Sequence, residues 1–165
     1  RRAARCRRRG AFGGAESPEI AERALAQMNQ PGVASRWVFG GHSRGAVVAC
    51  EMASRGLERF AGLILIGTSH PRDVNLSGLS VPVTKIFGTH DGLASLAEVE
   101  ENKTKLPPST NWVRIEGGNH CQFGWYGFQP GDHFAKISPA IQREQMLRAV
   151  IETLRKAAER PIPTN

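Results

Sequence analysis

The feature that most constrains this chain is a serine in the turn between an apolar strand and a helix of small residues. Residues 36–39 (Arg-Trp-Val-Phe) favour a short strand, and residues 46–53 favour a helix that ends near Gly56. Between them, residues 41–45 (Gly-His-Ser-Arg-Gly) fit the pattern Gly-x-Ser-x-Gly. In such a strand–turn–helix unit, small flanking residues permit a tight, strained turn that projects the serine hydroxyl above the sheet. The alternative is a glycine-rich turn that happens to contain serine.

A serine nucleophile needs an imidazole base, and an acid that orients the imidazole. In this arrangement the acid and then the base follow the serine in the chain, each after a strand. Residues 83–88 predict a strand that ends shortly before Asp91, and residues 111–116 alternate as a strand does before His120. Open α/β sheets build their sites at the carboxyl ends of strands. The sequence therefore predicts Ser43, Asp91 and His120 as the catalytic residues.

Other residues compete for these roles. Asp73 follows the apolar segment 63–66 and is the alternative acid, and His133 is the alternative base. Asp91 is preferred because it has the tighter strand-to-turn context, and His120 because a strand directly precedes it. Further candidates, for the substrate pocket, are the residue before the serine and three aromatic residues after the proposed base: His42, Phe123, Trp125 and Tyr126. The alternative for these aromatic residues is that they pin a loop to the core.

Three segments of the chain resemble a known family. They are residues 41–45, 88–93 (Gly-Thr-His-Asp-Gly-Leu) and 117–127 (Gly-Gly-Asn-His-Cys-Gln-Phe-Gly-Trp-Tyr-Gly). Together they resemble a bacterial α/β-hydrolase, most closely the small α/β-hydrolase fold-5 family, over about residues 18–155. The resemblance implies Ser43 as nucleophile, Asp91 as acid and His120 as base. It also implies an α/β fold of three layers, in which helices flank a mostly parallel sheet of about four strands.

The chain departs from the family pattern in two respects near the serine. Arg44 replaces a common apolar residue, and Ala46 replaces a frequent glycine. Neither change removes a catalytic group, because residue 44 supplies the oxyanion hole with its backbone N–H. The second oxyanion donor comes from a loop after an earlier strand, and only 42 residues precede Ser43. We therefore expect that roughly the first third of the fold is absent from this sequence.

The net charge of +7 is concentrated at one end of the chain. Six arginines within residues 1–9 supply +6, so residues 10–165 carry only +1. We expect residues 1–16 and 161–165 to be tails around a single hydrolase domain at 17–160, and we expect no specific nucleic-acid partner. The cysteines at positions 6, 50 and 121 have no CxxC spacing, so no metal or cofactor is expected. No stretch is long and apolar enough to cross a membrane.

These observations predict a serine hydrolase that cleaves small-molecule acyl esters through an acyl-enzyme. The alternative is a non-catalytic remnant of the fold that lacks a complete oxyanion hole. In either case the strand before Ser43 would form an exposed apolar sheet edge, through which the chain could self-associate.

Overall fold

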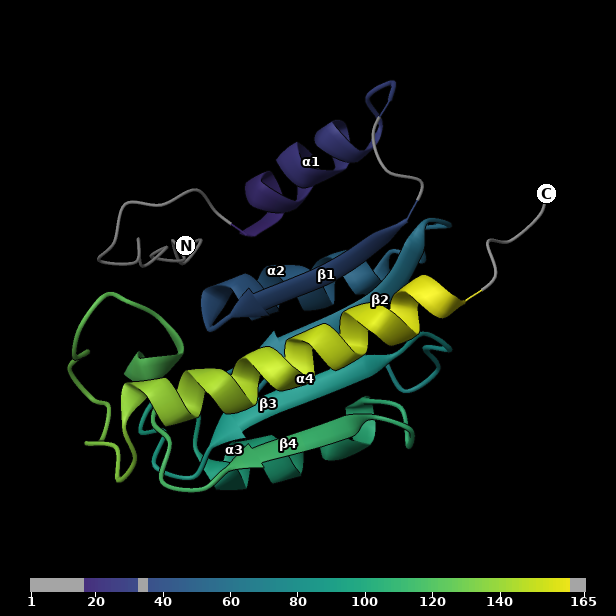
Figure 1. Ribbon diagram of the computed structural model, residues 1–165. Helices are drawn as coiled ribbons and strands as arrows, with labels where there is room; N and C mark the ends of the chain where they lie inside the picture. Colours follow the sequence, from purple (N-terminus) through teal and green to yellow (C-terminus); the bar gives the residue numbers. More distant parts are fainter. Residues whose placement is uncertain (1–16, 33–35, 161–165) are drawn as a thin grey trace, which may run out of the picture.

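The computed structural model of the chain describes residues 17–32 and 36–160, so the two predicted tails lie outside the described residues. The predicted order of strands and helices is confirmed (Figure 1). Along the chain the elements are α1 (Ser17–Met28), β1 (Trp37–His42), α2 (Arg44–Ser54), β2 (Phe60–Ile66), β3 (Val83–Gly88), α3 (Leu96–Glu101), η1 (Lys103–Lys105), β4 (Asn111–Ile115), η2 (Cys121–Phe123) and α4 (Pro139–Glu159).

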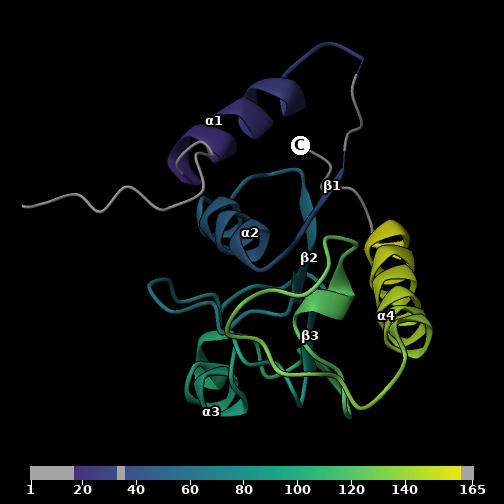
Figure 2. The same ribbon diagram turned by 90° about the vertical axis from the view of Figure 1, so that its left-hand side faces the viewer.

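The four strands form one sheet in the order β1-β2-β3-β4, and every neighbouring pair is parallel. Figure 2 shows the sheet on edge, with α1, α2 and α3 on one side and α4 on the other. The predicted three-layer α/β fold is therefore confirmed. Among the described residues, β1 is paired on one side only, so it forms an edge of the sheet.

Burial on both faces explains why the central strands are apolar almost throughout. Every residue of β3 is buried, as are the five central residues of β2. One core cluster lies between the sheet and α1 and α2, and includes Phe39, Leu63 and Leu65. A second lies under α4 and includes Ile64, Ile86 and Ile115. The alternation of side chains along each strand divides them between these two clusters.

Local sequence signals set the start of two helices. The sequence Ser95-Leu96-Ala97-Glu98 has the pattern of a capping box, and in α3 each of the two side chains accepts from the other residue's backbone N–H. Ser138 caps α4, and its hydroxyl accepts from the backbone N–H of Ile141. The sequence from Ser95 to the Pro107-Pro108 pair predicts one helix that ends at Leu106, but this prediction is too long, because α3 ends at Glu101 and a short 3₁₀ turn follows.

The helix α4 buries a different face from the one that its large apolar residues suggest. Four of these residues are exposed: Ile141, Leu147, Ile151 and Leu154. The buried residues are mostly small, namely Gln142, Ala149, Thr153 and Ala157. Small residues suit this face because α4 packs directly on β2, where a Cβ added at Gly62 would already be in van der Waals contact with Cβ of Ala157, at 3.5 Å. No helix of the described part is long and apolar enough to span a membrane.

Candidate active site

Ser43 lies in the turn between β1 and α2 with φ 55° and ψ −118°, and it is the only non-glycine residue with positive φ in the described part of the chain. Two features stabilise this strained conformation. The Ser43 N–H donates to the carbonyl of Ile66 at 3.0 Å. Gly41 permits the turn, since a Cβ there would lie 2.2 Å from the carbonyl carbon of Gly45. The structure thus has the geometry of a nucleophile elbow at the predicted position.

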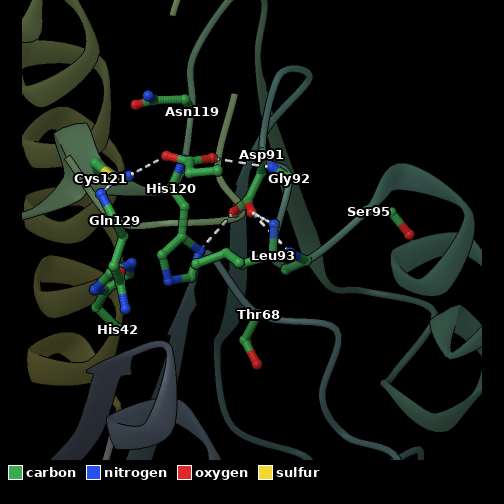
Figure 3. Close-up of polar contacts among 12 residues, drawn as sticks. His42, Thr68, Asp91, Gly92, Leu93, Ser95, Asn119, His120, Cys121 and Gln129 are labelled. Carbon is green, nitrogen blue, oxygen red and sulfur yellow. Dashed lines mark hydrogen bonds and ion pairs between the residues drawn. The ribbon is translucent and has the colours of Figure 1, made fainter. Parts of the chain in front are cut away.

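Asp91 and His120 form a buried pair at the carboxyl ends of β3 and β4. The His120 Nδ1–H donates to Oδ2 of Asp91 at 2.9 Å, and neither side chain is more than 2% exposed. The other carboxylate oxygen of Asp91 accepts from the backbone N–H groups of Leu93 (2.9 Å) and Ala94 (2.7 Å). Figure 3 shows the carboxylate between the imidazole ring and these N–H groups. Because both oxygens are occupied, the carboxylate is held in one orientation toward the ring.

A cavity of about 200 Å³ brings Ser43 and His120 together with Arg44. The second ring nitrogen of His120, Nε2, is buried and has no hydrogen-bond partner among the described residues. Because Nδ1 carries the proton that it donates to Asp91, Nε2 is the hydrogen-bond acceptor of the neutral ring. The cavity is therefore lined by a serine on a strained turn and by a histidine whose Nε2 is buried without a partner among the described residues.

Asp132 fixes the two loops that hold the pair. Its carboxylate accepts from the backbone N–H groups of Gly92 (3.0 Å), His120 (3.2 Å) and Cys121 (2.9 Å). Burial alone would raise the pKa of Asp132, but these hydrogen bonds and one from the Cys121 thiol outweigh it and lower that pKa. An ionised Asp132 thus links the Asp91 turn to the His120 loop across 40 residues of chain.

None of the four pocket candidates lines the cavity at Ser43. The His42 ring packs against His120, with centroids 4.4 Å apart, and against the buried ring of Phe123. The Tyr126 hydroxyl donates to Nδ1 of His42 at 2.9 Å. Burial, and then the neighbouring His120, lower the pKa of His42 to about 4, so its ring is neutral. Trp125 lines a separate hollow of about 480 Å³.

The competing residues do not reach the pair. Asp73 and His133 are exposed, and the described contact of His133 is through its carbonyl, which accepts from Asn119 at 2.7 Å. Cys121 is buried beside His120, and burial together with Asp132 raises the pKa of its thiol to about 11. A thiol of that kind is not reactive at neutral pH.

One wall of the cavity was missed by sequence reasoning. It is the loop after β2, which contributes Gly67, Thr68, Ser69, His70 and Arg72. The signal that could have found it is the one that pointed to Asp91 and His120, namely polar residues directly after a buried parallel strand. No cluster of three or more His, Cys, Asp or Glu side chains in residues 17–32 and 36–160 is arranged to hold a metal ion.

Comparison with known families agrees with this geometry. The model of the alpha/beta hydrolase family matches residues 19–144. This chain belongs to the alpha/beta hydrolase family. The match spans the elbow, the Asp91 turn and the His120 loop of this alpha/beta hydrolase. A comparison with curated protein sequences finds no match.

Solved structures share the fold of this alpha/beta hydrolase. A thermophilic esterase from Thermogutta terrifontis with malate bound is 19% identical, with a TM-score of 0.63 over 88% of this chain and 74% of that one. A ferulic acid esterase from Streptomyces cinnamoneus is 21% identical, with a TM-score of 0.63 over 89% of this chain and 50% of that one. A predicted CIB-like hydrolase from Thermoplasma acidophilum is 17% identical, with a TM-score of 0.61 over 85% of this chain and 60% of that one. This chain thus spans 50–74% of the length of these proteins.

Proposed function

We propose that this alpha/beta hydrolase is a serine esterase that cleaves small-molecule acyl esters, with Ser43, His120 and Asp91 as its catalytic triad. The observation that carries the proposal is the buried 2.9 Å contact between His120 and Asp91, beside a cavity that His120 shares with Ser43. Family membership supports hydrolysis, and two solved structures of the same fold are named as esterases. The finer assignment rests on the residues of this chain.

The proposed reaction starts with proton transfer. Nε2 of His120 accepts the proton of the Ser43 hydroxyl while Oγ attacks the carbonyl carbon of the ester. Asp91 keeps the ring in the tautomer with Nδ1 protonated and stabilises the imidazolium that forms. The ring then donates its proton to the departing alcohol, whose bond to the carbonyl carbon breaks. A water molecule, deprotonated by His120, hydrolyses the acyl-enzyme and releases the acid and free Ser43.

The negative charge that develops on the carbonyl oxygen requires nearby donors. In the proposed site the backbone N–H of Arg44, at the start of α2, supplies one. Esters are favoured over peptides because an alkoxide leaves more readily than an amine anion.

Labelling with a fluorophosphonate tests the proposal directly. We expect one covalent adduct by intact mass, lost in Ser43→Ala and His120→Gln and kept in Ser54→Ala. Ser54 is a matched control because it lies at the C-terminal end of α2, and its hydroxyl donates to the carbonyl of Glu51. Full esterase activity in Ser43→Ala would show that the assignment is wrong.

A specific observation favours the second candidate, a non-catalytic binding protein. Nε2 of His120 has no hydrogen-bond partner within the described residues, so the Ser43–His120 hydrogen bond is not formed in this conformation. Catalytic hydrogen bonds often tighten only in the substrate complex, which is why the esterase is preferred. Folded protein that binds esters but gives neither adduct nor turnover would support the binding protein.

A further inference from the structure

Two arginines line the Ser43 cavity, one from the start of α2 and one from the loop at residues 67–72. Arg44 and Arg72 line the cavity, and both are exposed at the surface. No described residue accepts a hydrogen bond from the Arg44 guanidinium or forms an ion pair with it. The lining contains no aspartate or glutamate. The open cavity is thus lined by two arginines and by no aspartate or glutamate.

Two lysines hydrogen-bond to the backbone of the loop at residues 67–72. Nζ of Lys85, on β3, donates to the carbonyl of His70, and Nζ of Lys105 donates to the carbonyl of Arg72. Lys85 is only 1% exposed and has no carboxylate among its described hydrogen-bond partners. A buried cation without a counter-ion is costly. Its charge and that of Lys105 add to the positive potential at the loop.

Only one carboxylate of this region is paired with a cation of the wall. Glu98 accepts from Arg72 at 2.5 Å, while the Arg72 Nε–H donates to the hydroxyl of Ser69 at 2.8 Å. Asp73 is exposed beside them.

Two buried carboxylates also contact the lining: Asp91 accepts from the backbone of Leu93 and Ala94, and Asp132 accepts from that of His120. Of the two arginines that line the cavity, Arg44 has no carboxylate partner among the described residues. An arginine without a carboxylate partner at an open cavity attracts an anion to that cavity.

We propose that this site is selective for esters that carry a carboxylate, which Arg44 and Arg72 recognise beside Ser43. The inference rests on the proposed function and names its substrate class. A planar guanidinium matches a carboxylate with two parallel hydrogen bonds, which a lysine does not. The cavity of about 200 Å³ is smaller than pockets for drug-sized ligands, so the acyl part is a short chain.

A matched pair of substrates tests the proposal. The anionic substrate is 4-nitrophenyl hydrogen adipate, and its neutral counterpart is methyl 4-nitrophenyl adipate. We expect a higher kcat/KM for the anionic ester, and a preference that falls as NaCl is added because exposed charges are screened. Arg44→Gln and Arg72→Gln should each reduce the ratio of the two kcat/KM values by about tenfold. Arg148→Gln is the control, because its exposed side chain pairs with Glu144 on α4, outside the cavity.

Glu98→Gln should change the preference for the anionic ester in the opposite direction. It removes the carboxylate that competes for Arg72, while the glutamine can still accept from the Ser95 N–H in the capping box. The preference for the anionic ester should therefore rise. A ratio that does not change in Arg44→Gln, Arg72→Gln and Glu98→Gln would overturn the proposal, and so would a preference for the neutral ester.

Binding separates this proposal from the proposed function. In Ser43→Ala, NMR titration should show tighter binding of monomethyl adipate than of dimethyl adipate, and Arg72→Gln in that background should remove the difference. Equal binding of the two would refute anion recognition even if the protein hydrolyses neutral esters. If the unmutated protein is not labelled by the fluorophosphonate at Ser43, the proposed esterase function is refuted. The binding of the two adipate esters would still test whether the site recognises an anion.

Discussion

The two glycines of the elbow should respond in opposite ways to the same substitution. The Gly-x-Ser-x-Gly pattern suggests that both flanking residues must be small. In the structure, a Cβ at Gly41 would lie 2.2 Å from the carbonyl carbon and 2.4 Å from the carbonyl oxygen of Gly45. A Cβ at Gly45 would have no described atom within 4 Å. Only Gly41→Ala should therefore damage the turn.

The expected magnitudes follow from these distances. An ordinary contact for a Cβ begins near 3.4 Å, so in Gly41→Ala the start of α2 must move away from β1 by about 1 Å. The obstacle is backbone and cannot rotate away, so we expect the free energy of unfolding to fall by about 3 kcal/mol. Gly45 lies in the first turn of α2, where alanine is the better helix former, and Gly45→Ala should raise that free energy by about 0.5 kcal/mol.

Urea unfolding followed by tryptophan fluorescence measures both values. A difference of about 3.5 kcal/mol between the variants corresponds to roughly 1–3 M urea in the midpoint. The rate of fluorophosphonate labelling at Ser43 reports the elbow itself, and it should fall strongly in Gly41→Ala and remain near the original in Gly45→Ala. If Gly45→Ala costs as much stability as Gly41→Ala, the steric reasoning is refuted.

Three further predictions concern the triad, a buried lysine and the sheet edge. Asp91→Asn should fold, because its amide oxygen can still accept from Leu93 and Ala94, yet kcat should drop by about 10⁴ because the His120 tautomer is wrong; wild-type turnover would contradict this. Burial lowers the pKa of Lys85 from 10.5 to about 8, so between those values the unfolded chain binds more protons than the folded one. The free energy of unfolding should then rise by about 2 kcal/mol between pH 8 and pH 10 relative to that of Lys85→Met, and a difference between the two proteins that stays constant over this range would refute it. Self-association through β1 should appear as a weight-average mass that grows with concentration in sedimentation velocity, whereas a monomer at every concentration would argue against it.

The helix α4 shows a limit of sequence reasoning. Its large apolar residues at helical spacing predict a helix, and the helix is present. They did not indicate the buried face, because the approach of α4 to the sheet at Gly62 admits only small side chains such as Ala157. Which face is buried depends on the distance between two backbones, and no local pattern in the helix records that distance.

The sequence by itself determined the order of strands and helices, the elbow at Ser43 and the capping box at Ser95, because each depends on residues only a few positions apart. Only the tertiary structure decided that Asp91, and not Asp73, lies against His120, that Asp132 holds both loops, and that Lys85 contacts the loop after β2. These contacts join residues that are 11 to 40 positions apart, and they follow from the order and register of parallel strands. Local periodicity encodes the elements, whereas the packing of the whole chain decides which of their ends meet.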